Sequence, residues 1–108
     1  MLSFLVSEYH FELYVAGNGL RSRAAIETLT AMCEERLARR YQLTVIDVLV
    51  DPELAESAKI LATPTLLRRK PGPPVRIIGD LTLTASVLVK LGVPQAAALP
   101  SVDTRKGT

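Results

Sequence analysis

Residues 8–50 read EYHFELYVAGNGLRSRAAIETLTAMCEERLARRYQLTVIDVLV, and this stretch decides the fold. In residues 8–15 apolar and polar side chains alternate, and one face of the alternation collects Tyr9, Phe11, Leu13 and Val15. A period of two with aromatic and β-branched residues predicts a β-strand. The turn-forming residues 16–19 end the strand, because glycine and asparagine favour turns.

An amphipathic helix is predicted to follow over about residues 22–40. Its apolar face collects side chains at helical spacing, namely Ile26, Leu29, Cys33 and Leu37. Ser22 is predicted to cap the first turn, because a hydroxyl can accept a free backbone N–H. Residues 42–50 are nearly all apolar and rich in β-branched types, which is typical of a strand buried on both faces. The order strand, helix, strand predicts a βαβ unit with parallel strands.

Shorter elements are predicted in the second half of the chain. Asp51 as N-cap and Pro52 at the first helical position start a short helix that ends near residue 61. Residues 66–69 and 75–79 are predicted as two short strands on either side of a Pro-rich turn. The whole order is βαβ-α-ββ-α, which is the layout of thioredoxin-like α/β proteins.

The last element stays open between two structures. In residues 81–93 the apolar side chains alternate as in a strand, yet the same residues fit a helix that Gly92 terminates. One domain is predicted over residues 1–94. Residues 95–108 are small and polar without periodicity, which predicts a mobile tail.

The composition excludes several classes of protein. With 108 residues, 48% of them hydrophobic and 22% charged, the chain has the make-up of one ordinary globular domain and not of a disordered protein. A single cysteine rules out an internal disulfide, which points to a reducing cytoplasm. The formal charge of +2 is too small to argue for nucleic acid. No apolar run reaches the roughly 18 residues that a membrane helix needs.

Candidate catalytic groups are few. Thioredoxin chemistry needs a thiol at the start of the first helix, and residues 17–22 contain no cysteine. Cys33 falls on the apolar face of the helix, so we expect a buried packing thiol, with a redox role as the alternative. His10 is the only histidine, and one histidine with one cysteine makes no metal cluster. We therefore expect no catalytic residue, no metal and no cofactor.

The remaining charged residues have structural explanations. Asp47 interrupts an apolar strand, so we expect it to satisfy the nearby loop or the first helix. Asp51 and Asp80 are expected to be capping residues. The basic residues 68–70 and Arg76 flank the Pro-rich turn and are expected to form a solvated strand end. An acidic protein partner is the alternative for this basic cluster, and nucleic acid ranks third.

Four blocks of the sequence carry a resemblance to a known family: LYVAGN at 13–18, VIDVL at 45–49, KILATPTL at 59–66 and IIGDL at 77–81. In this order, over about residues 8–93, they resemble the KaiB family of cyanobacterial circadian clock proteins. The resemblance implies a non-enzymatic regulator that binds the hexameric ATPase KaiC and shifts its phosphorylation or signalling state. It implies a KaiA-like protein or a clock histidine kinase as further partners.

The resemblance also implies two competing folds. One is a tetramer of order βαββααβ whose C-terminal segment is a strand. The other is a thioredoxin-like monomer whose C-terminal segment is a helix and which binds the ATPase ring. X-Pro bonds are expected to slow the switch, because their isomerisation takes tens of seconds or longer; they precede Pro64, Pro71, Pro73 and Pro74.

Two departures from the family pattern are expected to favour the helical state. Lys90 stands where the family commonly has glycine, which removes a helix penalty of about 1 kcal/mol. Gly92 is a good helix stop. We therefore expect a larger fraction of thioredoxin-like monomer or dimer than in a typical family member.

Five positions are expected to bind the partner. Tyr9, Lys59 and Arg76 match family residues at the ring-binding surface. Gln42 and Thr44 belong to the stretch Tyr-Gln-Leu-Thr, where the family commonly reads Tyr-Ala-Leu-Lys, so a basic residue of that edge is lost. This loss keeps an alternative function open: a thioredoxin-fold interaction module in a non-clock signalling or stress pathway.

Overall fold

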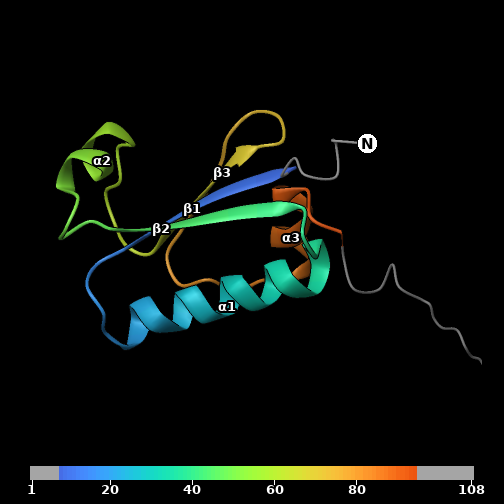
Figure 1. Cartoon of the computed structure of the whole chain (residues 1–108), viewed down its shortest axis with the longest axis horizontal. Helices are drawn as coiled ribbons and strands as arrows, with labels where there is room; N and C mark the ends of the chain where they lie inside the picture. Colours follow the sequence, from blue (N-terminus) through green and yellow to red (C-terminus); the bar gives the residue numbers. More distant parts are fainter. Residues whose placement is uncertain (1–7, 95–108) are drawn as a thin grey trace, which may run out of the picture.

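The computed structural model describes residues 8–94, which form one four-stranded sheet and three helices. Figure 1 shows the elements in chain order. They are β1 (Tyr9–Val15), α1 (Leu20–Leu37), β2 (Tyr41–Asp47), α2 (Pro52–Ser57), β3 (Thr65–Lys70), β4 (Val75–Ile78) and α3 (Ala85–Leu91). The predicted order βαβ-α-ββ-α is confirmed. The predicted tail, residues 95–108, lies outside the described residues.

The strands follow the spatial order β2-β1-β3-β4. β1 pairs parallel with β2, as the βαβ prediction requires, and antiparallel with β3; β3 pairs antiparallel with β4. The central strand β1 carries the predicted alternation, and its apolar face packs against α1 and α3 in the main core. Among the buried residues of this core only Tyr9 and Phe11 are aromatic, and their rings stack with centroids 6.1 Å apart.

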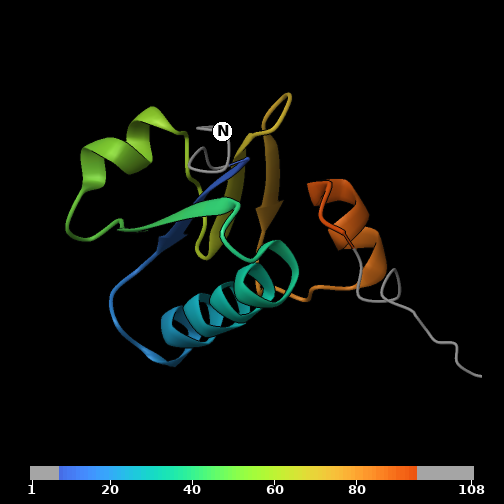
Figure 2. The ribbon, with the colours of Figure 1, turned by 45° about the vertical axis from the view of Figure 1, so that its right-hand side comes forward.

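α2 belongs to a second, smaller cluster on the other face of the sheet. There Ala58, just after α2, packs with Tyr14, Ile46 and Leu67. Figures 1 and 2 show α2 at one end of the sheet and α3 at the opposite end. α1 and α3 therefore share one face, and α2 covers only part of the other.

Helix α1 departs from the sequence prediction at its start. It begins at Leu20 with Gly19 as the N-cap residue, and no side chain caps it. Ser22 is buried inside the first turn, where its hydroxyl donates to the carbonyl oxygen of Ala16 at 3.1 Å. The predicted cap is therefore wrong: the hydroxyl ties the helix to the preceding loop instead.

The prediction that residues 42–50 are buried on both faces is also wrong. β2 is an edge strand, ends at Asp47 and leaves Val45 exposed. Residues 48–50 form a turn. The apolar composition of residues 42–50 shows only that these side chains favour burial. Burial on both faces of a strand also requires packed elements on each side of the sheet, and β2 is not fully covered in this way.

The open choice for residues 81–93 is settled as a helix. Thr84 caps α3 by accepting the Val87 N–H at 3.3 Å, and Gly92 ends it in the left-handed conformation with a φ of 73°. Leu88 and Leu91 are buried in the main core. Leu81 and Leu83 pack against the same core from the segment before the helix.

Candidate functional site

The loop between β1 and α1 occupies the place where a thioredoxin-like fold carries its reactive thiol. Asp47 organises this loop, because one carboxylate oxygen accepts the N–H groups of Gly17 and Leu49, each at 2.9 Å. The prediction that Asp47 satisfies a nearby loop is confirmed. The loop has no cysteine and therefore lacks the nucleophile of thioredoxin thiol chemistry.

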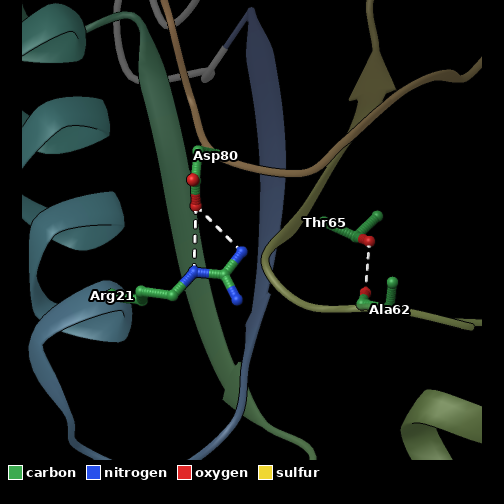
Figure 3. Close-up of polar contacts among 4 residues, drawn as sticks. All are labelled: Arg21, Ala62, Thr65 and Asp80. Carbon is green, nitrogen blue, oxygen red and sulfur yellow. Dashed lines mark hydrogen bonds and ion pairs between the residues drawn. The ribbon is translucent and has the colours of Figure 1, made fainter.

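A second polar contact joins the start of α1 to the segment after β4. The guanidinium of Arg21 donates to one carboxylate oxygen of Asp80 at 2.9 and 3.0 Å (Figure 3). Both side chains are largely exposed. The predicted capping role of Asp80 is wrong, because its carboxylate forms this ion pair. Asp51 is the N-cap residue of α2, but its side chain makes no capping hydrogen bond.

Pro64 and its neighbours border the same loop. An open pocket of about 310 Å³ lies between Leu20, Ala24, Pro64 and Leu81. Thr65 donates its hydroxyl proton to the carbonyl oxygen of Ala62 at 2.6 Å, which holds the approach to β3 (Figure 3). The wall of the pocket is mostly apolar, with the Arg21–Asp80 ion pair on one side.

Cys33 has the character predicted for a packing thiol. It is fully buried on the core face of α1. Burial, with a smaller contribution from Glu34, raises the pKa of its thiol to about 12. At neutral pH the thiol is therefore protonated and is not a nucleophile. Within residues 8–94, no group of three or more His, Cys, Asp or Glu side chains is placed to hold a metal ion.

The structure divides the five predicted partner-binding residues among three places. Gln42 and Thr44 lie exposed on the edge strand β2. Arg76 lies on β4, the opposite edge strand, and donates to the carbonyl oxygens of Ala58 at 2.9 Å and Lys59 at 3.3 Å. Arg76 and Lys59 are therefore neighbours at the end of α2.

Tyr9 occupies the third place, inside the main core. Its side chain is buried, and its hydroxyl donates to the carbonyl oxygen of Gly92 at 2.7 Å. Tyr9 therefore positions the end of α3, and its hydroxyl group is already used in a hydrogen bond within the protein.

The basic residues 68–70 do not form one solvated strand end. Arg68 is only 6% exposed and donates to the carbonyl oxygens of Leu91 and Pro73, each at 2.7 Å. Its Nε is buried without a hydrogen-bond partner. Arg69 instead pairs with Glu12 at 3.0 Å on the other face of the sheet. The expectation of a solvated cluster is therefore wrong for Arg68.

Sequence reasoning missed Arg68, although a signal was present. Residues alternate between faces along a strand, so Arg68 falls on the same face as the core residue Leu66. An arginine in that position must find acceptors inside the protein. Here they are the last helical carbonyl of α3 and the turn between β3 and β4.

No helix of the described residues is long and apolar enough to cross a membrane.

Comparison with solved structures supports the thioredoxin-like fold. The chain is similar to chloroplastic thioredoxin z, with a TM-score of 0.65 at 22% identity, over 80% of this chain and 77% of that one. It is similar to the N-terminal domain of Synechococcus elongatus SasA, with a TM-score of 0.61 at 23% identity, over 68% of this chain and 70% of that one. At these identities the likeness shows the fold alone.

Comparison of sequences is more specific. The KaiB domain model matches residues 12–93. The circadian clock oscillator protein KaiB of Thermostichus vulcanus is 51% identical over 83 residues, which are 77% of each chain. The circadian clock protein KaiB3 of Synechocystis is 44% identical over 81 residues, 75% of this chain and 79% of that protein. The chain therefore belongs to the KaiB family of circadian clock proteins, a regulatory rather than a catalytic family.

Proposed function

We propose that this protein is a non-enzymatic regulator in the cytoplasm that binds a KaiC-like hexameric ATPase and shifts its phosphorylation or signalling state. One observation carries the proposal: a KaiB-family chain keeps a thioredoxin-like fold whose reactive position contains no cysteine. The fold then offers surfaces and no thiol chemistry. A KaiA-like protein or a clock histidine kinase is proposed as a further partner.

The proposed ring-binding surface centres on Lys59 and Arg76. Arg76 holds the backbone after α2 through two carbonyl oxygens, so it presents the exposed Lys59 side chain at a defined place. Gln42 and Thr44 on the β2 edge supply uncharged contacts, and Tyr9 acts from the core by positioning α3. A single charge reversal at Lys59 should therefore weaken the complex.

Co-migration with a cognate KaiC-like ATPase tests this proposal. The wild-type chain is mixed with the ATPase in the presence and absence of nucleotide and analysed by size-exclusion chromatography. Lys59→Glu should reduce binding about tenfold or more, whereas Arg39→Glu, a charge reversal at another exposed position, just beyond α1, should bind as the wild type does. No complex with the wild-type chain under any nucleotide condition would refute the proposal.

The proposed switch concerns residues 81–93. α3 has only seven residues and buries only Leu88 and Leu91, so its stability depends on tertiary contacts. Two hydrogen bonds to its last carbonyls, from Arg68 and Tyr9, supply part of that stability. Because the same residues also fit a strand, a few kcal/mol decide between the two packings.

Residues at the end of α3 influence the equilibrium between the helical and the strand form of residues 81–93. Lys90 lies exposed in the last turn of α3 and Gly92 provides its left-handed stop, and both favour the helix. We propose that the X-Pro bonds at Pro64, Pro71, Pro73 and Pro74 slow the interconversion. The solution mass and the NMR secondary structure of residues 81–93 test the proposal: a monomer or dimer with a helix is expected, and an exclusive tetramer with a C-terminal strand would contradict it.

A second candidate function rests on the β2 edge. Thr44 stands where the family commonly has a lysine, and Gln42 beside it is uncharged as well, so this edge suits a different protein partner. In that case the chain is a thioredoxin-fold interaction module in a non-clock signalling or stress pathway. Failure to bind the cognate ATPase, with a retained thioredoxin-like structure, would favour this candidate.

A further inference from the structure

The open pocket of about 310 Å³ beside the first turns of α1 suits an apolar, uncharged occupant. Its size falls at the lower end of the range of about 300–1,000 Å³ that is typical of binding sites. Its apolar lining includes Ala24, Leu81 and Leu20, whose side chain is 80% exposed. The two charged groups of its wall, Arg21 and Asp80, pair with each other. An occupant therefore needs no charge of its own to match this wall.

An exposed row of mostly small side chains runs along α1 to this pocket. Its members follow one another at intervals of four, three and four residues, namely Ala24, Thr28, Ala31 and Glu35. This spacing places them on one side of the helix. The first two line the pocket. Because three of the four side chains are small, the backbone of another segment can approach α1 closely along this row.

The described residues end beside the other end of the same helix. The guanidinium of Arg36 lies 3.5 Å from the carbonyl oxygen of Pro94. Figures 1 and 2 both show α3 next to the C-terminal end of α1. From position 36 back to position 24, α1 spans about 18 Å at about 1.5 Å per residue. An extended chain covers about 3.3 Å per residue, so about five or six residues after Pro94 reach the pocket.

The sequence that follows Pro94 fits this path. Residues 95–100 read Gln-Ala-Ala-Ala-Leu-Pro and carry no charge. The three alanines fall where the chain would pass the small side chains of α1. Leu99 is the fifth residue after Pro94, which is the distance of the pocket. So short a tether gives Leu99 an effective concentration in the millimolar range, so a weak contact is enough to hold it in the pocket.

We propose that residues 95–100 dock back onto α1 in an extended conformation, with the side chain of Leu99 in the pocket between Leu20, Ala24 and Leu81. The docked segment covers the surface beside the first turns of α1, and a partner that uses this surface must displace it. The mobile tail predicted from the sequence is then reduced to the part that follows the docked segment. This inference goes beyond the proposed function and does not depend on the ATPase partner.

A nitroxide spin label on Ser101→Cys reports where the segment lies. The full chain is labelled at this position, while the buried, protonated thiol of Cys33 stays unmodified. Paramagnetic broadening of the NMR signals should be strongest for the amides of residues 20–28 and 80–81. A free tail would instead broaden mainly the C-terminal end of α1, next to Pro94, and this result would overturn the inference.

Two substitutions test the contact from its two sides. Leu99→Asp and Ala24→Glu should each lower the broadening of residues 20–28 about tenfold or more, because each places a charge in an apolar contact. Thr30→Glu is the matched control, since Thr30 is also exposed on α1 but lies on a different side from the row, and it should leave the broadening unchanged. Thermal unfolding checks that each variant is folded. Unchanged broadening in Leu99→Asp, or an equal loss in Thr30→Glu and Ala24→Glu, would overturn the inference.

Other occupants of the pocket would give different results. A mixture of spin-labelled chains with isotope-labelled chains that carry no spin label detects docking between molecules. Broadening of residues 20–28 in this mixture would make the tail of a second copy the occupant. A label on Ser3→Cys that broadens these residues, while the label at position 101 does not, would make residues 1–7 the occupant. Either result would overturn the inference.

Discussion

Arg68→Met is the substitution for which the structure makes its sharpest prediction. The methionine keeps much of the length and apolar volume of the side chain, while the two donated hydrogen bonds to Leu91 and Pro73 disappear. The bond to Leu91 is buried, so its carbonyl oxygen is left without a donor. Because α3 is short and buries few side chains, this loss should act mainly on its C-terminal end.

The magnitude follows from the two bonds. A hydrogen bond from a charged donor contributes about 1.5–3 kcal/mol. The bond to Pro73 is only partly buried, and water can replace it. Removal of a buried cation whose Nε has no partner offsets part of the cost. We expect a net loss of about 2 kcal/mol, which corresponds to a roughly thirtyfold increase in local opening of α3.

Amide hydrogen exchange measures this opening. Protection of the amides at the C-terminal end of α3, those of Gly92 and Val93, should fall about thirtyfold, while the amides of β1 should change much less. Arg69→Met is the matched control, because Arg69 makes only an exposed pair with Glu12 and should cost at most about 1 kcal/mol. Unchanged protection of α3 in Arg68→Met would refute the reasoning, as would an equal loss in the Arg69 variant.

Three further predictions concern single positions. Gly92→Ala should lower the free energy of unfolding more than Gly72→Ala. Both glycines have φ near +74°, but only at Gly92 would an added Cβ meet the Arg68 Nη1, at 3.1 Å. Thermal unfolding of both variants checks this, and equal losses of stability would contradict it. The buried Cys33 thiol keeps its proton in the folded state, so the stability that it contributes is present below pH 9 and is lost as the pH rises toward 12. Between pH 9 and 10, Cys33→Ala should therefore reduce the decline of the unfolding free energy with pH, by at most about 1.4 kcal/mol per pH unit. An identical decline in the wild type and the variant would exclude this origin. Asp47→Ala should cost about 1–3 kcal/mol, since the N–H groups of Gly17 and Leu49 lose their acceptor; the midpoint of urea unfolding measures it, and an unshifted midpoint would count against it.

Local pattern predicted most of the architecture. The alternation in residues 8–15 is created by a strand with one apolar face, so it directly reports β1. The spacing of Leu29, Cys33 and Leu37 likewise reports the face of α1 that packs on the sheet. The expectation that Asp47 satisfies a loop needed only the observation of a carboxylate in an apolar strand.

Other features required the tertiary structure. The apolar run at 42–50 looks the same in a central strand and in an edge strand, because its composition is local and its neighbours are not. In the sequence Arg68 is indistinguishable from the surface cations beside it. Only the position of β3, between β1 and β4 and in contact with α3, shows that this side chain is buried. The candidate site also depends on the tertiary structure. Arg76 on β4 donates to the backbone carbonyl oxygen of Lys59, whereas Gln42 lies on β2, the opposite edge strand.

The sequence by itself determined the family, the order of elements and the absence of thioredoxin thiol chemistry, because each depends on which residues occur and at what spacing. The tertiary structure decided the conformation of residues 81–93. Their apolar side chains satisfy both a strand and a helix, so local preference leaves the two nearly equal. Burial of Leu88 and Leu91, with the hydrogen bonds from Arg68 and Tyr9 to the last carbonyls, selects the helix, and these contacts exist only once the sheet has formed.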